Sequence, residues 1–140
     1  MQVEHVNITV GDITEAVNFL TTAMPEFAIR GEGDSESNGK TYHWIHIGTD
    51  ESYVALQGPT ANTRASLERY ADVGTNHIGF VVEDINKVVK NLTQSGYEMT
   101  SDNQEHPARR RVYFETRDGL EWEFIQYFST ELSQRNDYKI

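Results

Sequence analysis

The chain has no cysteine among its 140 residues. Disulfide bonds, thiolate metal sites and a cysteine nucleophile are therefore excluded, so any metal ion must be held by nitrogen and oxygen ligands. Basic residues are also scarce, with 12 lysines and arginines against 22 aspartates and glutamates, and the formal net charge is −10. Because an acidic chain repels phosphate backbones, we expect no nucleic-acid partner.

Long apolar runs are missing as well. No stretch of the sequence approaches the roughly 20 apolar residues of a membrane span, and the first residues show no signal-type apolar region. We therefore expect a cytoplasmic protein that does not contact membranes. The apolar content of 37% and the charged content of 24% are those of an ordinary globular chain.

The sequence contains an internal repeat. Residues 5–21 align without gaps on residues 77–93 at an offset of 72, with seven identities in seventeen positions. Two related modules are the simplest explanation of such a match. We predict a first module over residues 1–57, a polar linker over 58–74, a second module over 75–128 and a tail over 129–140 that has no assigned role in the fold.

Each module is expected to open with a strand and a helix. Apolar and polar residues alternate from His5 to Val10, which is typical of a half-buried strand. Asp12 and Asp84 can cap the helices that follow, and the spacing of apolar residues gives each helix one apolar face. Further strands are expected at about 27–30, 41–47, 53–57, 97–100, 110–116 and 120–128, with a loop over 31–39 and a turn at 118–119.

The predicted fold class is α+β, with two β-α-β-β-β modules forming a cupped mixed sheet and helices on its outer faces. In the last strand Glu123 lies on the face away from the bulky Trp122 and Phe124. His5, His77 and Glu123 would then project into one cavity. Two imidazoles and a carboxylate with open positions beside them suit Fe(II), Mn(II) and similar ions, so we predict these three residues as metal ligands.

These residues also resemble a known pattern. A histidine near the start of each module and a glutamate in the last strand are similar to the vicinal-oxygen-chelate superfamily, over residues 3–128. The superfamily includes glyoxalase I, methylmalonyl-CoA epimerase, fosfomycin-resistance enzymes, bleomycin-binding proteins and extradiol dioxygenases. The resemblance implies a divalent metal, with Fe(II) favoured over Mn, Ni, Co or Zn, a small-molecule substrate and a homodimer. No residues are assigned to an organic cofactor.

A fourth ligand of that superfamily usually lies on the last strand of the first module. This chain has the segment Tyr53–Gln57 there. Alignment of Ala55 with Glu123 leaves no fourth ligand, whereas a shift by two residues makes Gln57 a possible one. Ligation by two histidines and one glutamate alone is what extradiol dioxygenases show.

The second module also resembles the extradiol dioxygenase signature. His106 is followed by Tyr113, a glycine-containing turn and then Glu123, although Arg117 stands where the signature has proline. The resemblance implies that Tyr113 hydrogen-bonds the substrate or an oxygen intermediate. His106 would be the base or a polar guide.

Three functions remain open. The leading hypothesis is an Fe(II)-dependent extradiol-type dioxygenase acting on a small catechol-like compound, and the alternative is a glyoxalase I- or epimerase-like lyase or isomerase. The third is a non-enzymatic binding protein of the bleomycin-resistance type. Tyr42, Trp44 and His46 share one strand face and are expected to line the substrate cavity, although the same aromatic stripe could form a subunit interface.

Overall fold

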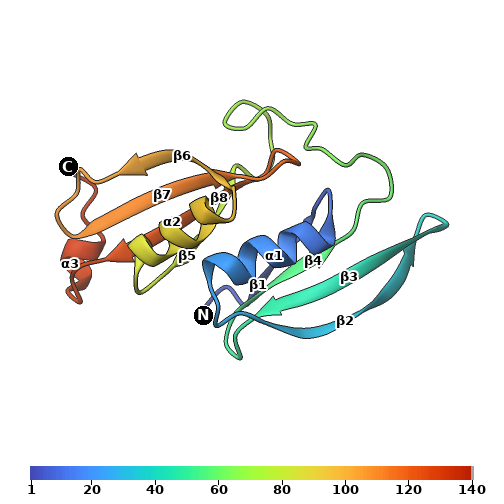
Figure 1. The fold of residues 1–140 in the computed structure, drawn as a ribbon, viewed down its shortest axis with the longest axis horizontal. Coiled ribbons are helices and arrows are strands. Elements are labelled where there is room, and N and C mark those ends of the chain that lie inside the picture. The colour runs from blue at the N-terminus through green and yellow to red at the C-terminus, as the bar shows by residue number, and fades with distance from the viewer. Residues whose placement is uncertain (140) are drawn as a thin grey trace. The chain divides into compact units, whose positions relative to one another are not determined.

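The structure is a computed structural model that describes residues 1–139 (Figure 1). The order strand, helix and three strands occurs twice and is followed by a short helix. The elements are β1 (His5–Thr9), α1 (Ile13–Ala23), β2 (Ala28–Ser37), β3 (Lys40–Gly48), β4 (Tyr53–Gln57), β5 (His77–Val81), α2 (Ile85–Gln94), β6 (Glu98–Asn103), β7 (Arg109–Glu115), β8 (Glu121–Tyr127) and α3 (Leu132–Arg135). The α+β class and the repeated module are confirmed.

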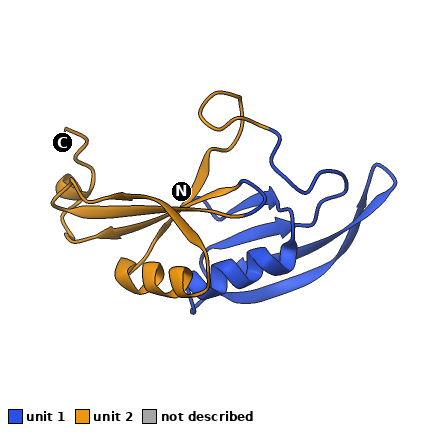
Figure 2. Ribbon diagram, turned by 45° about the horizontal axis from the view of Figure 1, so that its top comes forward, with its two compact units in different colours: residues 1–66, 117–119 blue, residues 67–116, 120–140 orange. Residues whose placement is uncertain are grey.

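Each module has its own four-stranded mixed sheet. The strand order is β1-β4-β3-β2 in the first sheet and β5-β8-β7-β6 in the second, so the two orders are equivalent. In both sheets the first and last strands of the module pair in parallel and the other pairings are antiparallel. Two compact units, coloured in Figure 2, contain these sheets: unit 1 is residues 1–66 with 117–119, and unit 2 is the rest.

Aspartate caps begin the two long helices, as predicted. The carboxylate of Asp12 accepts from the backbone N–H of Glu15 over 3.0 Å, and that of Asp84 accepts from Lys87 over 3.1 Å. Each cap satisfies an N–H group that has no partner within the helix. After α2, Gly96 adopts a φ of +86°, a conformation that glycine takes without a steric penalty.

The helix of each unit packs on the apolar face of its own sheet. In unit 1, α1 contacts β3 and β4, and in unit 2, α2 contacts β6, β7 and β8. The buried side chains of the two helices are Ala16, Phe19, Leu20, Ala23, Ile85, Val88 and Leu92. Because the apolar side of each sheet is covered in this way, the polar side carries the residues available for binding.

The segment predicted as a loop over residues 31–39 is mostly strand. β2 extends to Ser37 and is joined to β3 by Asn38 and Gly39, whose φ angles are +52° and +73°. An Asn-Gly pair with two positive φ angles is the preferred two-residue hairpin turn. The loop prediction was wrong because β2 has no alternation of apolar residues, and the Asn-Gly signal was not used.

The linker and the tail contain little regular structure. The linker has one turn, in which the N–H of Asp72 bonds the carbonyl of Glu68 over 2.9 Å, and the tail contains α3. Within residues 1–139, no helix has the length and apolar character to cross a membrane.

Candidate metal centre

Two of the three predicted metal ligands lie side by side in unit 2. The parallel pairing of β5 with β8 sets His77 opposite Glu121 and Gly79 opposite Glu123. Nε2 of His77 is 3.0 Å from a carboxylate oxygen of Glu123, whose side chain is 8% exposed. A buried carboxylate is costly without a partner, and the His77 ring nitrogen lies within hydrogen-bond distance of it.

Gly79 leaves the space that the Glu123 carboxylate occupies. A Cβ atom at position 79 would be 3.1 Å from Oε2 of Glu123, which is tighter than most such contacts. Neighbouring strands are only about 4.8 Å apart, so a side chain here would compete directly with the carboxylate. The glycine therefore permits a buried carboxylate on the adjacent strand.

The other ring nitrogen of His77 contacts the linker. Nδ1 is 3.1 Å from the hydroxyl oxygen of Tyr70, and the same hydroxyl donates to Glu121 over 2.6 Å. A phenol has one proton to donate. With that proton directed at Glu121, the Tyr70 oxygen accepts from Nδ1–H, and a neutral His77 presents the lone pair of Nε2 to Glu123.

Two acceptors that face each other in this way repel unless a positive charge lies between them. A proton on the imidazole would remove the repulsion, and so would a divalent ion bound to both atoms. Two ligand atoms about 2.1 Å from one ion and at right angles lie about 3 Å apart, which matches the separation of His77 and Glu123. Imidazole and carboxylate are also donors that first-row divalent metals accept, so the pair fits such an ion.

Tyr113 holds the second carboxylate oxygen of Glu123. The pairing of β7 with β8 sets the two residues opposite each other, and the Tyr113 hydroxyl donates over 2.7 Å. Burial, and then the hydrogen bond to the carboxylate, raise the pKa of Tyr113 well above its usual range. The phenol is therefore protonated at neutral pH and can act as a hydrogen-bond donor in the site.

An arginine balances the acidic residues near His77. Nη2 of Arg69 is 2.5 Å from Glu115 and 3.7 Å from Glu121. The hydrogen bond to Glu115 raises the pKa of Arg69, and the hydrogen bond to Glu121 raises the pKa of Tyr70. Tyr70 has a φ of +64°, and its backbone N–H donates to the side chain of Asn76 over 2.7 Å. Residues of the linker thus form hydrogen bonds and ion pairs around His77.

Sequence reasoning missed Tyr70, Arg69 and Gly79. The first two lie in a polar segment that has no counterpart in the internal repeat, so no pattern singled them out. The role of Gly79 could have been found, because parallel pairing of the strands that contain His77 and Glu123 brings Gly79 next to the carboxylate.

The third predicted ligand, His5, belongs to unit 1. Its Nδ1 is 3.0 Å from the carboxylate of Glu4, and its ring stacks on Tyr53 with centroids 4.7 Å apart. β1 has the same place in its sheet as β5 has in the other, so His5 is the structural counterpart of His77. Within either unit by itself, the described residues form no group of three or more His, Asp or Glu side chains suited to a metal ion.

The strand register identifies the counterpart of Glu123 in unit 1. Asn7 pairs with Ala55 in the first sheet as Gly79 pairs with Glu123 in the second. Ala55 therefore occupies the equivalent position, and Gln57 lies two residues farther along the strand. This register corresponds to the alignment that leaves no fourth ligand on β4.

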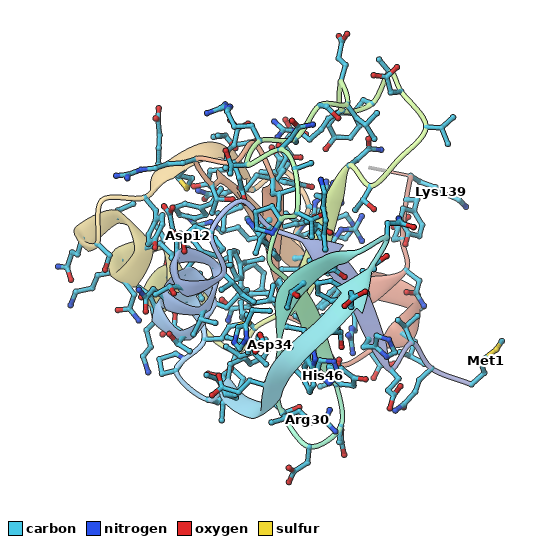
Figure 3. All side chains as sticks on the ribbon, turned by 90° about the vertical axis from the view of Figure 1, so that its right-hand side faces the viewer. Met1, Asp12, Arg30, Asp34, His46 and Lys139 are labelled. Carbon is cyan, nitrogen blue, oxygen red and sulfur yellow. The ribbon has the colours of Figure 1, made fainter. Side chains whose placement is uncertain are left out.

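Aromatic side chains cover the polar face of the first sheet. Tyr42, Trp44 and His46 are half-buried on one side of β3. The ring centroid of His46 is 4.9 Å from that of Trp44 and 4.8 Å from that of Tyr53, and the Arg30 guanidinium lies 4.3 Å above the Tyr53 ring. Figure 3 labels Arg30 and His46 on these neighbouring strands. Such a face can hold a flat or partly apolar molecule.

His106 lies away from the His77–Glu123 pair. It precedes β7, whose first residue, Arg109, pairs with Tyr127 at the far end of β8. His77 is instead level with Glu121, the first residue of β8. Of the two residues predicted to take part in catalysis, Tyr113 is at the candidate centre and His106 is at the opposite end of the same sheet.

Comparison with protein families gives one match over most of the chain. A family model described as the Glyoxalase/Bleomycin resistance protein/Dioxygenase superfamily matches residues 2–124. A comparison with curated protein sequences gives no match.

Solved structures of similar fold cover nearly the whole chain. A glyoxalase family protein from Bacillus cereus has a TM-score of 0.75 at 18% identity, covering 92% of this chain and 95% of its own. The fosfomycin resistance protein FosX from Listeria monocytogenes, solved with Mn(II) and sulfate, gives 0.67 at 15% identity, with 97% and 98% covered. The trypanothione-dependent glyoxalase I of Leishmania major gives 0.69 at 16% identity, with 90% and 86% covered. At these identities the similarity shows the fold.

Proposed function

The chain belongs to the glyoxalase/bleomycin resistance protein/dioxygenase superfamily, and on that premise we propose that it is a divalent-metal enzyme acting on a small molecule. The proposed ligands are His5, His77 and Glu123. The observation that carries the proposal is the 3.0 Å approach of His77 Nε2 to the buried Glu123 carboxylate. Both atoms are acceptors in the tautomer that Tyr70 favours, so the pair has a place for a cation.

The residues at the candidate centre would have separate roles. A bound divalent ion would supply Lewis-acid chemistry, or oxygen activation if the ion is iron. Tyr113 would keep Glu123 oriented through its hydrogen bond and could donate the same proton to a substrate oxygen. Tyr70 and Glu121 would hold His77 with Nε2 directed at the ion.

Elemental analysis of the purified protein tests the metal proposal. We expect stoichiometric divalent metal in the wild type and its loss in Glu123→Gln, which keeps the size of the side chain but removes its charge. Glu98→Gln, on the exposed position of β6, is the matched control and should retain the metal. Equal metal content in wild type and Glu123→Gln would sink the proposal.

We propose an Fe(II)-dependent extradiol-type dioxygenase as the first reaction to test. Ala55 in place of a fourth ligand supports it, since a site with fewer protein ligands leaves more positions for two substrate oxygens and O2. Tyr113 is the proton donor available for the substrate. His106 has no part in this proposal, because it lies at the other end of the sheet.

Measurement of oxygen uptake tests the proposed dioxygenase activity. Protein reconstituted anaerobically with Fe(II) should consume O2 when a catechol is added, and Tyr113→Phe should retain its metal but lose most of the activity. If no member of a catechol panel causes oxygen uptake by the iron-loaded protein, the dioxygenase is ruled out.

A lyase or isomerase related to glyoxalase I or the epimerase is the second candidate. It is favoured by the absence of His106 from the centre, where Tyr113 and Glu123 are among the groups that could move a proton. This reaction predicts exchange of a carbon-bound substrate proton with solvent deuterium and no oxygen uptake. A binding protein without catalysis predicts instead that ligand binding survives His5→Ala and His77→Ala.

The expected homodimer stays a prediction, and light scattering of the purified protein would test it.

A further inference from the structure

A half-buried arginine without a partner lies beside the candidate metal centre. Three consecutive arginines open β7, and they differ in their contacts. Arg109 donates to two carbonyl groups of the tail, and Arg110 donates to the carboxylate of Asp102. Arg111 is half-buried and makes no hydrogen bond or ion pair with any of residues 1–139. Because a guanidinium that is partly withdrawn from water is costly without an acceptor, the unpaired state of Arg111 needs an explanation.

Strand register places Arg111 next to the candidate centre on the same face of the sheet. Tyr113, whose hydroxyl bonds the carboxylate of Glu123, is two residues farther along β7. Side chains two residues apart on a strand share a face and lie roughly 7 Å apart. Arg111 pairs with Ile125 as Tyr113 pairs with Glu123. A small molecule that touches the His77–Glu123 pair could therefore also contact this arginine.

Asn103 supplies a second donor beside Arg111. The two residues pair across β6 and β7, and the Cβ atoms of such a pair are about 5 Å apart. The Ser101 hydroxyl donates to Oδ1 of Asn103 over 3.2 Å, which directs the amide oxygen toward Ser101. Nδ2 of Asn103 has no acceptor among residues 1–139. The amide and the guanidinium thus form a pair of neighbouring donor groups without acceptors.

The other half of this row of residues is apolar. Pairing across the sheet gives the order Val81, Ile125, Arg111 and Asn103. Val81 is 64% exposed, and Ile125 is half-buried. A Cβ atom at Gly79 would be 3.6 Å from Cδ1 of Ile125, so the absence of a side chain leaves space in front of the isoleucine. A molecule with an apolar body and an anionic end would complement the row.

The two donor groups favour a carboxylate as that anionic end. The planar guanidinium of an arginine matches the two oxygens of a carboxylate through parallel hydrogen bonds. The chain's net charge of −10 repels anions in general, so an anion needs a local cation, which Arg111 provides. A doubly charged phosphate would meet stronger repulsion than a carboxylate with one charge.

We propose that the candidate centre acts on a small carboxylate with a flat apolar body. The carboxylate accepts from the guanidinium of Arg111 and from Nδ2 of Asn103, and the body lies over Ile125. The opposite end of the molecule reaches the His77–Glu123 pair. The ends of a para-substituted benzene ring are separated by a distance comparable to the step from Arg111 to Tyr113. This substrate class rests on the proposed function, but the carboxylate site can be tested without a metal ion.

Benzoate is the probe for the carboxylate site. Purified full-length ¹⁵N-labelled protein is titrated with benzoate in the presence of a chelator, because a metal ion would also bind the carboxylate. We expect saturable NMR shifts at the backbone amide of Ile125, at Nε of Arg111 and at the side-chain amide of Asn103. Benzyl alcohol, which has the ring but no charge, should bind at least about tenfold more weakly, since hydrogen bonds to charged groups account for about that factor.

Two variants test the donors separately. Arg111→Met keeps the length of the side chain but removes its charge, and we expect benzoate affinity to fall at least about tenfold. Asn103→Asp places a carboxylate opposite Arg111, where the two form a favourable cross-strand pair. This variant should lose benzoate binding with its fold retained, even if Arg111→Met fails to fold. Arg117→Met, whose side chain is 91% exposed, is the matched control, because all three substitutions make the chain more acidic by one charge.

The metal-loaded protein tests the substrate class. Arg111→Met should keep the metal content of the wild type. The wild type should favour 3,4-dihydroxybenzoate over catechol at least about tenfold in kcat/KM, and Arg111→Met should lose this preference. Saturable binding of benzoate at Arg111 without any reaction of the two catechols would count against the dioxygenase and would still support the carboxylate site.

Several outcomes overturn the proposal. One is the absence of saturable shifts at Arg111 and Asn103, and another is benzyl alcohol binding as tightly as benzoate. A third is wild-type benzoate affinity in both Arg111→Met and Asn103→Asp. An equal loss of affinity in Arg117→Met would show that net charge, and not a local site, governs the binding.

Discussion

The contact between Tyr70 and His77 shows how a single residue outside both modules can affect the chemistry of a proposed ligand. Its hydroxyl lies 3.1 Å from Nδ1 of His77 and donates to Glu121 over 2.6 Å. Because the two ring nitrogens of a neutral histidine have opposite roles, this contact selects Nε2 as the atom that can bind a metal ion.

Replacement of Tyr70 by phenylalanine tests that role. The ring is kept, but Nδ1 of His77 loses its hydrogen-bond acceptor. We expect divalent-metal affinity to fall at least about tenfold, as when other residues that hydrogen-bond a metal ligand are replaced. Competition with a metal-sensitive dye measures the affinity, and the ¹⁵N shifts of His77 report the tautomer. Tyr138→Phe, an exposed tyrosine of the tail, is the control. Unchanged affinity and tautomer in Tyr70→Phe would show that the contact is incidental.

Gly79 is a second residue that shapes the candidate site, because its lack of a side chain leaves room for the Glu123 carboxylate. In Gly79→Ala the added methyl group would be 3.1 Å from Glu123 Oε2, so the carboxylate must shift. We expect weaker metal binding with the fold retained, measured by the same competition and by circular dichroism. Gly31→Ala is the matched strand control, because its Cβ would have its nearest neighbour at 4.0 Å. A Gly79→Ala protein with wild-type metal affinity would contradict the close fit.

At the scale of elements, β6 and β7 are joined by a bidentate ion pair. Nε and Nη2 of Arg110 donate to the two carboxylate oxygens of Asp102 over 2.9 and 2.7 Å, and both side chains are less than one quarter exposed. The hydrogen bond from Arg110 holds the pKa of Asp102 below its usual range. The folded state therefore binds this proton less readily than the unfolded chain does.

This pair predicts a loss of stability in acid. Because the folded pKa is the lower one, the contribution of Asp102 is fully present above the unfolded pKa of about 3.9 and is lost as the pH falls through the folded value. We expect Asp102→Asn to reduce the free energy of unfolding by about 1 kcal/mol at pH 7. Urea unfolding at pH 7 and below pH 3 measures this, and the two proteins should converge in acid. A constant difference across that range would contradict the assignment.

At the scale of the whole molecule, a proposed metal ion would couple binding to folding. An ion that binds only the native state at a hundred times its dissociation constant adds about 2.7 kcal/mol of stability. We therefore expect removal of metal to lower the melting temperature of the wild type by several degrees, as measured by calorimetry. Glu123→Gln should melt at one temperature with or without chelator. A chelator effect of equal size in that variant would place the stabilising ion elsewhere.

Much of the fold could be predicted because its signals are local. Alternation around His5, the caps at Asp12 and Asp84 and the spacing of apolar residues along each helix depend on backbone geometry over a few residues. The internal repeat then extended these local patterns to two equivalent sheets. β2 was underpredicted where local signals are weak, since most of its residues are exposed and only the Asn38–Gly39 turn indicates the hairpin.

The candidate site, like the fold, could be predicted from the sequence only in part. The sequence by itself determined that His77 and Glu123 are on the polar faces of two strands of one module, because side-chain direction alternates strictly along a strand. Only the tertiary structure decided which residues meet them. Parallel register places Gly79 next to the carboxylate, and the linker places Tyr70 at Nδ1 of His77. His106, which precedes β7, lies at the opposite end of the sheet. Such contacts depend on pairing and packing between distant segments, which no local pattern specifies.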